Sequence, residues 1–116
     1  MSDLADRYLS AWNATDQAVR RAALEQAFTS DVRYVDPLAD VRGADALDAT
    51  IAAVQGQFPG FVFSLLGEAE AHHDVVRFRW GLGPAGQEPV VEGSDVVTTA
   101  GGRISGVTGF LDKLPA

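Results

Sequence analysis

The chain has 116 residues, 47% of them apolar and 22% charged, with a net charge of -7 and no cysteine. These values predict one compact domain over residues 1–116, large enough for one core and one pocket. The negative charge argues against nucleic acid or a membrane surface as a partner. The start of the chain lacks the basic and apolar regions of a secretion signal, and we expect a cytoplasmic protein.

The residue types also argue against metal and cofactor chemistry. There are no thiols, and the two histidines, His72 and His73, are adjacent in an expected turn. The glycines fall in turns between strands and do not connect a strand to a helix, as a phosphate-binding loop does. We therefore expect no metal site and no cofactor.

Two helical patterns begin the chain. The first is expected from about residue 2 to about residue 14, with Leu4, Tyr8 and Trp12 on one face. The second is expected over residues 16–28, where Val19, Ala23 and Ala27 form the apolar stripe. The first of these faces carries a phenol and an indole toward the expected core.

A short strand and a third helix come next. Val32, Tyr34 and Asp36 alternate with residues of the opposite face, and Pro37 ends the strand because it has no N–H to donate. After Gly43, a helical pattern runs to about residue 58. Helices therefore dominate the first half of the chain.

The second half alternates as an antiparallel sheet does. Strands are expected over residues 61–71, 75–83, 89–99 and 103–111, joined by tight turns. Within 75–83, one face carries Val76, Phe78, Trp80 and Leu82. Helices followed by a meander of hairpins indicate an α+β fold.

Three polar residues are expected to point inward. A buried Tyr8 needs a partner for its hydroxyl, most often a backbone carbonyl. Asp36, at a strand end before proline, is typical of a turn. Asp95 lies in the middle of a strand, where aspartate is disfavoured, and a buried carboxylate must be protonated or paired. Asp95 is therefore the most informative of the three.

Several segments together carry a resemblance to a known family. They are DRYLSAWNATD in the first helix, YVDP at the strand end, the RG before the third helix, the alternating strand and the DVV…GGRI hairpin. In this combination the chain resembles the nuclear transport factor 2-like superfamily, especially ketosteroid isomerases and SnoaL-type polyketide cyclases. The resemblance implies a cone-shaped, cystatin-like fold, with three N-terminal helices packed on a curved, mostly antiparallel sheet that encloses a pocket.

The resemblance also implies roles for the three polar residues. Tyr8 matches the oxyanion-hole tyrosine of ketosteroid isomerases, Asp36 the general base, and Asp95 the oxyanion-hole aspartic acid, which such enzymes keep protonated in an apolar site. The implied pocket walls are Trp12, Tyr34, Phe58, Val76, Phe78 and Trp80. The implied activity is that of a steroid Δ-isomerase-like enzyme, which moves a double bond in a small hydrophobic ketone by enolisation without a cofactor.

The chain also departs from these isomerases. Val35 replaces the glutamate that precedes their base, and the supporting tyrosine of some members falls near Ile51, which argues against an extended tyrosine network. Two alternatives stay open: a non-catalytic SnoaL-like domain that binds a small ligand, and a polyketide cyclase or dehydratase with Asp36 as acid or base. Relatives commonly pair through the open face of the sheet, so we expect a homodimer that uses Arg77, Arg79, Val90 and Val96.

Overall fold

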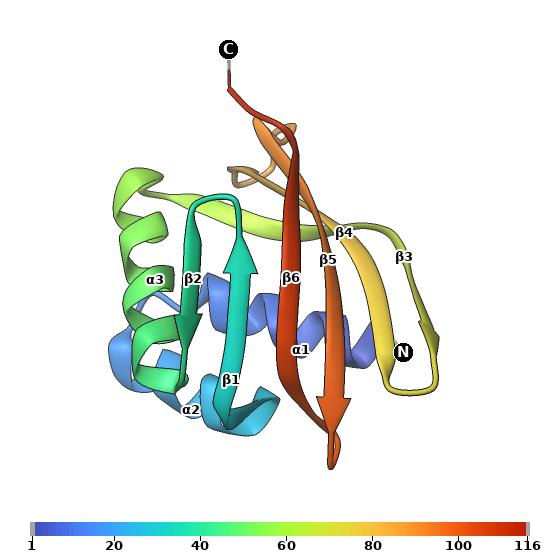
Figure 1. The fold of residues 1–116 in the computed structure, drawn as a ribbon. Coiled ribbons are helices and arrows are strands. Elements are labelled where there is room, and N and C mark those ends of the chain that lie inside the picture. Colours follow the sequence, from blue (N-terminus) through green and yellow to red (C-terminus); the bar gives the residue numbers. More distant parts are fainter. Residues whose placement is uncertain (1, 116) are drawn as a thin grey trace.

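Three helices cover one face of a single six-stranded sheet in the computed structural model, which describes residues 2–115 (Figure 1). In chain order the elements are α1 (Ser2–Asn13), α2 (Gln17–Ala27), β1 (Phe28–Asp36), β2 (Ala39–Arg42), α3 (Ala44–Gln57), β3 (Phe61–His72), β4 (Val75–Pro84), β5 (Val91–Ala100) and β6 (Arg103–Lys113). The architecture confirms the expected α+β fold.

The strand order in the sheet is β2-β1-β6-β5-β4-β3. Neighbouring strands are antiparallel except β1 and β6, which are parallel, so the sheet is mostly antiparallel as expected. The register of β3 against β4 shifts between Leu66 and Glu70, where Gly67 adopts a positive φ of 71°. This irregularity accompanies the bend of β3 around the edge of the sheet in Figure 1.

Two features of β1 and β2 were not expected from the sequence. β1 begins at Phe28 rather than at Asp31, and β2 pairs with it as a hairpin in which Asp36 lies opposite Ala39. The four residues of β2 alternate between half-buried and exposed, but a run of four is at the lower limit of length for predicting a strand.

The prediction of the apolar stripe on α2 is partly wrong. Val19 is 59% exposed, whereas Arg20, Leu24 and Ala27 are buried. The reason is a buried ion pair, in which Arg20 Nε donates to Asp48 Oδ1 of α3 at 2.5 Å. A charged residue on the inward side of α2 shifts the buried face by one position from the one that hydrophobicity alone predicts.

The core lies between the helices and the inner face of the sheet. Leu47 and Ile51 of α3 are fully buried there, and Tyr8 of α1 packs edge-on against Phe78 with ring centroids 5.1 Å apart. At one end of this layer the packing is incomplete. The polar residues singled out in the sequence lie around that end.

Candidate functional site

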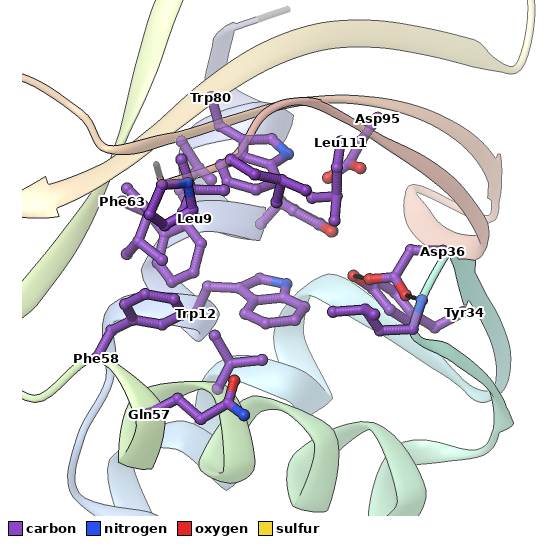
Figure 2. Close-up of a pocket in the computed structure, with 17 residues that line it drawn as sticks. Leu9, Trp12, Tyr34, Asp36, Gln57, Phe58, Phe63, Trp80, Asp95 and Leu111 are labelled. Carbon is purple, nitrogen blue, oxygen red and sulfur yellow. Dashed lines mark hydrogen bonds between the residues drawn. The ribbon is translucent and has the colours of Figure 1, made fainter.

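A pocket lies between α1, the end of α3 and the inner face of the sheet (Figure 2). Its volume is about 130 Å³, and its walls are mainly apolar side chains from α1, α3 and all strands except β2. Tyr8, Asp36 and Asp95 all line it. The structure therefore brings the three polar candidates together in one cavity.

Tyr8 and Asp95 form the buried polar end of the pocket. Tyr8 is 2% exposed and Asp95 is 3% exposed. Burial raises the pKa of Asp95 to about 6, an effect opposed by the nearby Tyr8 hydroxyl and Trp80 indole and reinforced by the charge of Asp36. Burial, and then the negative charge of Asp95, hold the pKa of Tyr8 well above its usual range. Tyr8 thus stays a neutral hydrogen-bond donor, and Asp95 becomes one below about pH 6.

Asp36 is held by three hydrogen bonds at the end of β1. Its Oδ1 accepts from the backbone N–H groups of Leu38 and Ala39, both at 2.8 Å, and its Oδ2 accepts from the Tyr34 hydroxyl at 2.6 Å. The first two bonds are those of a turn-forming aspartate, as the sequence allowed. Because a carboxylate has about four acceptor positions, one remains for a ligand.

Tyr34 lies in the pocket wall beside Asp36. It is 5% exposed, and burial raises the pKa of its hydroxyl, with the hydrogen bond to Asp36 adding to the rise and the neighbouring Tyr8 hydroxyl opposing it. The expectation that an extended tyrosine network is missing stays a prediction, because the hydroxyl of Tyr34 donates to Asp36. Ile51 supplies no hydroxyl, but Tyr34 supplies one from β1 instead of from the third helix.

Gly109 makes the approach of the two carboxyl groups possible. It lies on β6, between β1 and β5, directly opposite Asp95. A Cβ at position 109 would come within 2.5 Å of Asp95 Oδ1 and 3.4 Å of Asp36 Cβ. Neighbouring strands are roughly 4.8 Å apart, so the backbones of Asp36 and Asp95 are separated by roughly 10 Å. A glycine facing inward from a strand is a signal that sequence reasoning did not use.

Four of the six expected wall residues line the pocket: Trp12, Tyr34, Phe58 and Trp80. Val76 and Phe78 do not, although both are buried on the expected face of β4. They lie farther along β4, where Phe78 contacts the Tyr8 ring and both residues belong to the core cluster. The alternation identified the correct face of the strand but not the part of it that borders the pocket.

Other wall residues were not identified from the sequence. Leu9 and Phe63 lie beside Trp12 and Trp80 in the pocket wall in Figure 2, and Leu111 lies beside Asp95. Phe63 packs edge-on against both indoles, with ring centroids 5.4 Å from each. Its place in the alternating segment of β3 could have marked it as inward-facing.

The remaining candidates lie away from the pocket. His72 and His73 are exposed at the turn between β3 and β4, and within residues 2–115 no group of three potential ligands could hold a metal ion. Arg77 and Arg79 point to the opposite face of the sheet, where they pair with Glu70 and Glu92. No helix in the described part of the chain is long and apolar enough to cross a membrane.

Comparison with known proteins gives relatives for nearly the whole chain. Residues 5–107 match the SnoaL-like domain family. An isomerase candidate of the SnoaL-like family from Agrobacterium tumefaciens str. C58 is 40% identical, with 96% of both chains covered and a TM-score of 0.90. No curated protein matches the chain.

More distant structures share the fold. A ketosteroid isomerase candidate from Kribbella flavida DSM 17836 is 19% identical, covering 98% of this chain and 78% of that chain, with a TM-score of 0.66. A SnoaL-like polyketide cyclase candidate from Jannaschia sp. CCS1 is 18% identical, covering 96% and 86%, with a TM-score of 0.72. The family match and the 40% identical relative show that the chain belongs to the SnoaL-like family.

Proposed function

We propose that this protein is a cofactor-independent isomerase that enolises a small apolar ketone and moves its double bond. The observation that carries the proposal is the position of Tyr8 and Asp95, two buried acidic groups at one end of an apolar pocket that Asp36 also lines. A carbonyl oxygen placed between Tyr8 and Asp95 meets two donors, and the carbon next to that carbonyl group comes within reach of a carboxylate.

The proposed reaction transfers one proton and needs no other reactant. Asp36 removes a proton from the carbon between the carbonyl group and the double bond, and the electron pair of the broken C–H bond spreads into a dienolate. Tyr8 and protonated Asp95 donate hydrogen bonds to the oxygen as its negative charge develops. Asp36 then returns the proton to the far end of the former double bond, which leaves a conjugated ketone and the protein unchanged.

The protonation of Asp95 supports this role at mildly acidic pH. Burial raises its pKa to about 6, so the donor form dominates below that value. A developing oxyanion next to Asp95 raises this pKa further, because a second negative charge disfavours the ionised carboxylate. Binding of the enolate and protonation of Asp95 therefore reinforce each other.

The volume of the pocket limits the size of the substrate that it can enclose. A dry cavity of about 150 Å³ holds one benzene molecule, and this pocket measures about 130 Å³. It thus has room for about one six-membered ring, and the other rings of a steroid would have to lie at the mouth, near Leu38 and Leu114. We propose a one-ring ketone as the better substrate.

The test compares a β,γ-unsaturated cyclohexenone with a β,γ-unsaturated steroid ketone, and follows the ultraviolet absorbance of the conjugated product. We expect the one-ring ketone to have the larger kcat/KM, and Asp36→Asn to reduce its turnover at least a hundredfold, as removal of a general base does. Asp31→Asn, which changes an exposed carboxylate of the same strand outside the pocket, is the matched control. Unchanged turnover in the Asp36 variant would refute the proposed mechanism.

One observation favours a second candidate, a binding domain without catalysis. Asp36 already accepts three hydrogen bonds, as a structural aspartate does. This candidate predicts that the protein binds one-ring ketones but turns over neither the cyclohexenone nor the steroid. A cyclase or dehydratase, the remaining alternative, keeps Asp36 as acid or base and differs only in the substrate that the pocket admits.

We also propose that two copies pair through the outer face of the sheet. Phe110 is 56% exposed on this face, opposite Ser94 of β5, and Val96 lies half-buried on the same strand as Ser94. On the other side of Ser94 lies Arg79 of β4, which pairs with Glu92. An exposed aromatic ring surrounded by charged groups of both signs fits a second copy of itself.

A further inference from the structure

Trp12 carries a buried hydrogen-bond donor in the wall of the pocket. Its side chain lines the pocket and is 5% exposed, yet its Nε1 has no hydrogen-bond partner. Two other buried side-chain atoms within residues 2–115 lack a hydrogen-bond partner, Arg7 Nε, which faces Asp3 Oδ2 at 3.4 Å, and Thr29 Oγ1. Neither residue lines the pocket. Because nearly all buried donors are partnered, an unpartnered N–H in a pocket wall indicates a partner that enters with the ligand.

The Trp12 ring is fixed in place. Its centroid lies 5.6 Å from that of Tyr34 and 5.4 Å from that of Phe63, and Gln55 Nε2 donates to the Trp12 backbone oxygen at 2.9 Å. Figure 2 shows its nitrogen on the side of the ring away from Phe58, toward the interior of the pocket. A donor held in this way loses little freedom when a ligand binds.

We propose that Trp12 Nε1–H donates directly to the ligand oxygen that Tyr8 and Asp95 bind, as a third donor of the site. Tyr8 and Trp12 lie one turn apart on α1 and both line the pocket, with ring centroids 6.3 Å apart. Burial raises the pKa of Tyr8 and the charge of Asp95 adds to the rise, whereas the Trp12 N–H lowers it. An oxygen that accepts from Tyr8 is therefore within reach of Trp12. An indole N–H donates and never accepts, so it favours a carbonyl, enolate or phenolate oxygen over a hydrocarbon group at every pH.

This inference deepens the proposed function and rests on it in one respect, the oxygen subsite at Tyr8 and Asp95. The probes are phenol and toluene, which have one ring each and differ by an oxygen in place of a methyl group. We expect Trp12→Phe to weaken phenol binding about tenfold relative to toluene binding, the factor that one hydrogen bond contributes. The change in packing affects both probes alike, so their ratio isolates the N–H group.

The same comparison in the Tyr8→Phe background separates a direct bond from an indirect one. A direct donor keeps its effect on the phenol-to-toluene ratio when the Tyr8 hydroxyl is gone. If the effect disappears in that background, Trp12 acts only through Tyr8, and the proposal of a direct bond is wrong. An equal loss of both probes would show a packing role, which also overturns it.

A measurement on the unchanged protein covers the case in which Trp12→Phe does not fold. The chain has two tryptophans, so a nitrogen–proton correlation spectrum contains two indole N–H signals. We expect phenol, and not toluene, to move the Trp12 proton signal downfield, whereas an unmoved signal overturns the inference. Wild-type protein that does not prefer phenol over toluene would instead contradict the proposed oxygen subsite itself.

Discussion

At the scale of single residues, Asp95 makes stability depend on pH. Burial raises its folded pKa to about 6, while the ordinary value is 3.8. Between these values the folded chain keeps a proton that the unfolded chain has released, so stability falls as pH rises from about 4 to about 6. The loss is about 3 kcal/mol, since each pKa unit corresponds to about 1.4 kcal/mol.

Asp95→Asn is expected to remove this dependence. The difference in unfolding free energy between the variant and the wild type then changes by about 3 kcal/mol between pH 4 and pH 7, in favour of the variant at the higher pH. Urea titrations at several pH values measure it. A difference in unfolding free energy that stays constant with pH would show that burial does not raise the pKa of Asp95.

Tyr34 and Asp36 are expected to be coupled. The Tyr34 hydroxyl donates to Asp36 Oδ2 at 2.6 Å, and a hydrogen bond to a charged group contributes about 1.5–3 kcal/mol. Tyr34→Phe should therefore lower stability by about 2 kcal/mol in the wild type and by much less in an Asp36→Asn background. A double-mutant cycle measures the coupling, and additive losses would argue against it.

Only part of the site could be predicted, because a sequence gives the residue types but not the contacts that their side chains make. Asp95 was evident because aspartate is unfavourable in the middle of an apolar strand. The hydrogen bond from Tyr34 to Asp36 was not, because both residues fit an ordinary strand end and the bond depends on a side-chain rotamer. The missing hydrogen-bond partner of Trp12 Nε1 could not be predicted either. A sequence can place an indole on one face of a helix, but it does not show which groups surround the indole nitrogen.

At the scale of elements, the strands place the site through their order and register. Asp36 and Asp95 lie on β1 and β5, and Gly109 of β6 lies between them. Alternation predicted the faces of β4 and β5 correctly, because one face is buried along the whole strand. It could not predict that Trp80 borders the pocket while Phe78 does not, since this depends on where the helices end above the sheet.

Gly109→Ala is expected to disturb the site more than the fold. The new methyl group would lie 2.5 Å from Asp95 Oδ1, so the carboxyl group has to leave its present position in the pocket. We expect phenol affinity, measured by calorimetry, to fall at least tenfold, by the loss of about one hydrogen bond. Gly106→Ala is the control on the same strand, because its methyl group meets the exposed Thr98 hydroxyl, outside the pocket. Equal affinity in both variants would contradict this role for Gly109.

At the scale of the whole molecule, the net negative charge and the exposed Phe110 affect whether two copies of the chain can form a dimer. Residues of opposite charge are paired on the outer face of the sheet, as in Arg77 with Glu70 and Arg79 with Glu92, so the net charge of -7 does not prevent two such faces from meeting. Light scattering at micromolar concentration should give a dimer, and Phe110→Glu should give a monomer. A wild-type monomer under these conditions would contradict the pairing.

The parallel pairing of β1 with β6 also has a consequence for synthesis on the ribosome. β1 is made early and β6 after every other strand, yet β6 inserts between β1 and β5. Contacts between segments so distant in sequence form slowly. The nascent chain therefore cannot hold a ligand until β6 has emerged, and completion of the sheet and appearance of the binding site are one folding event.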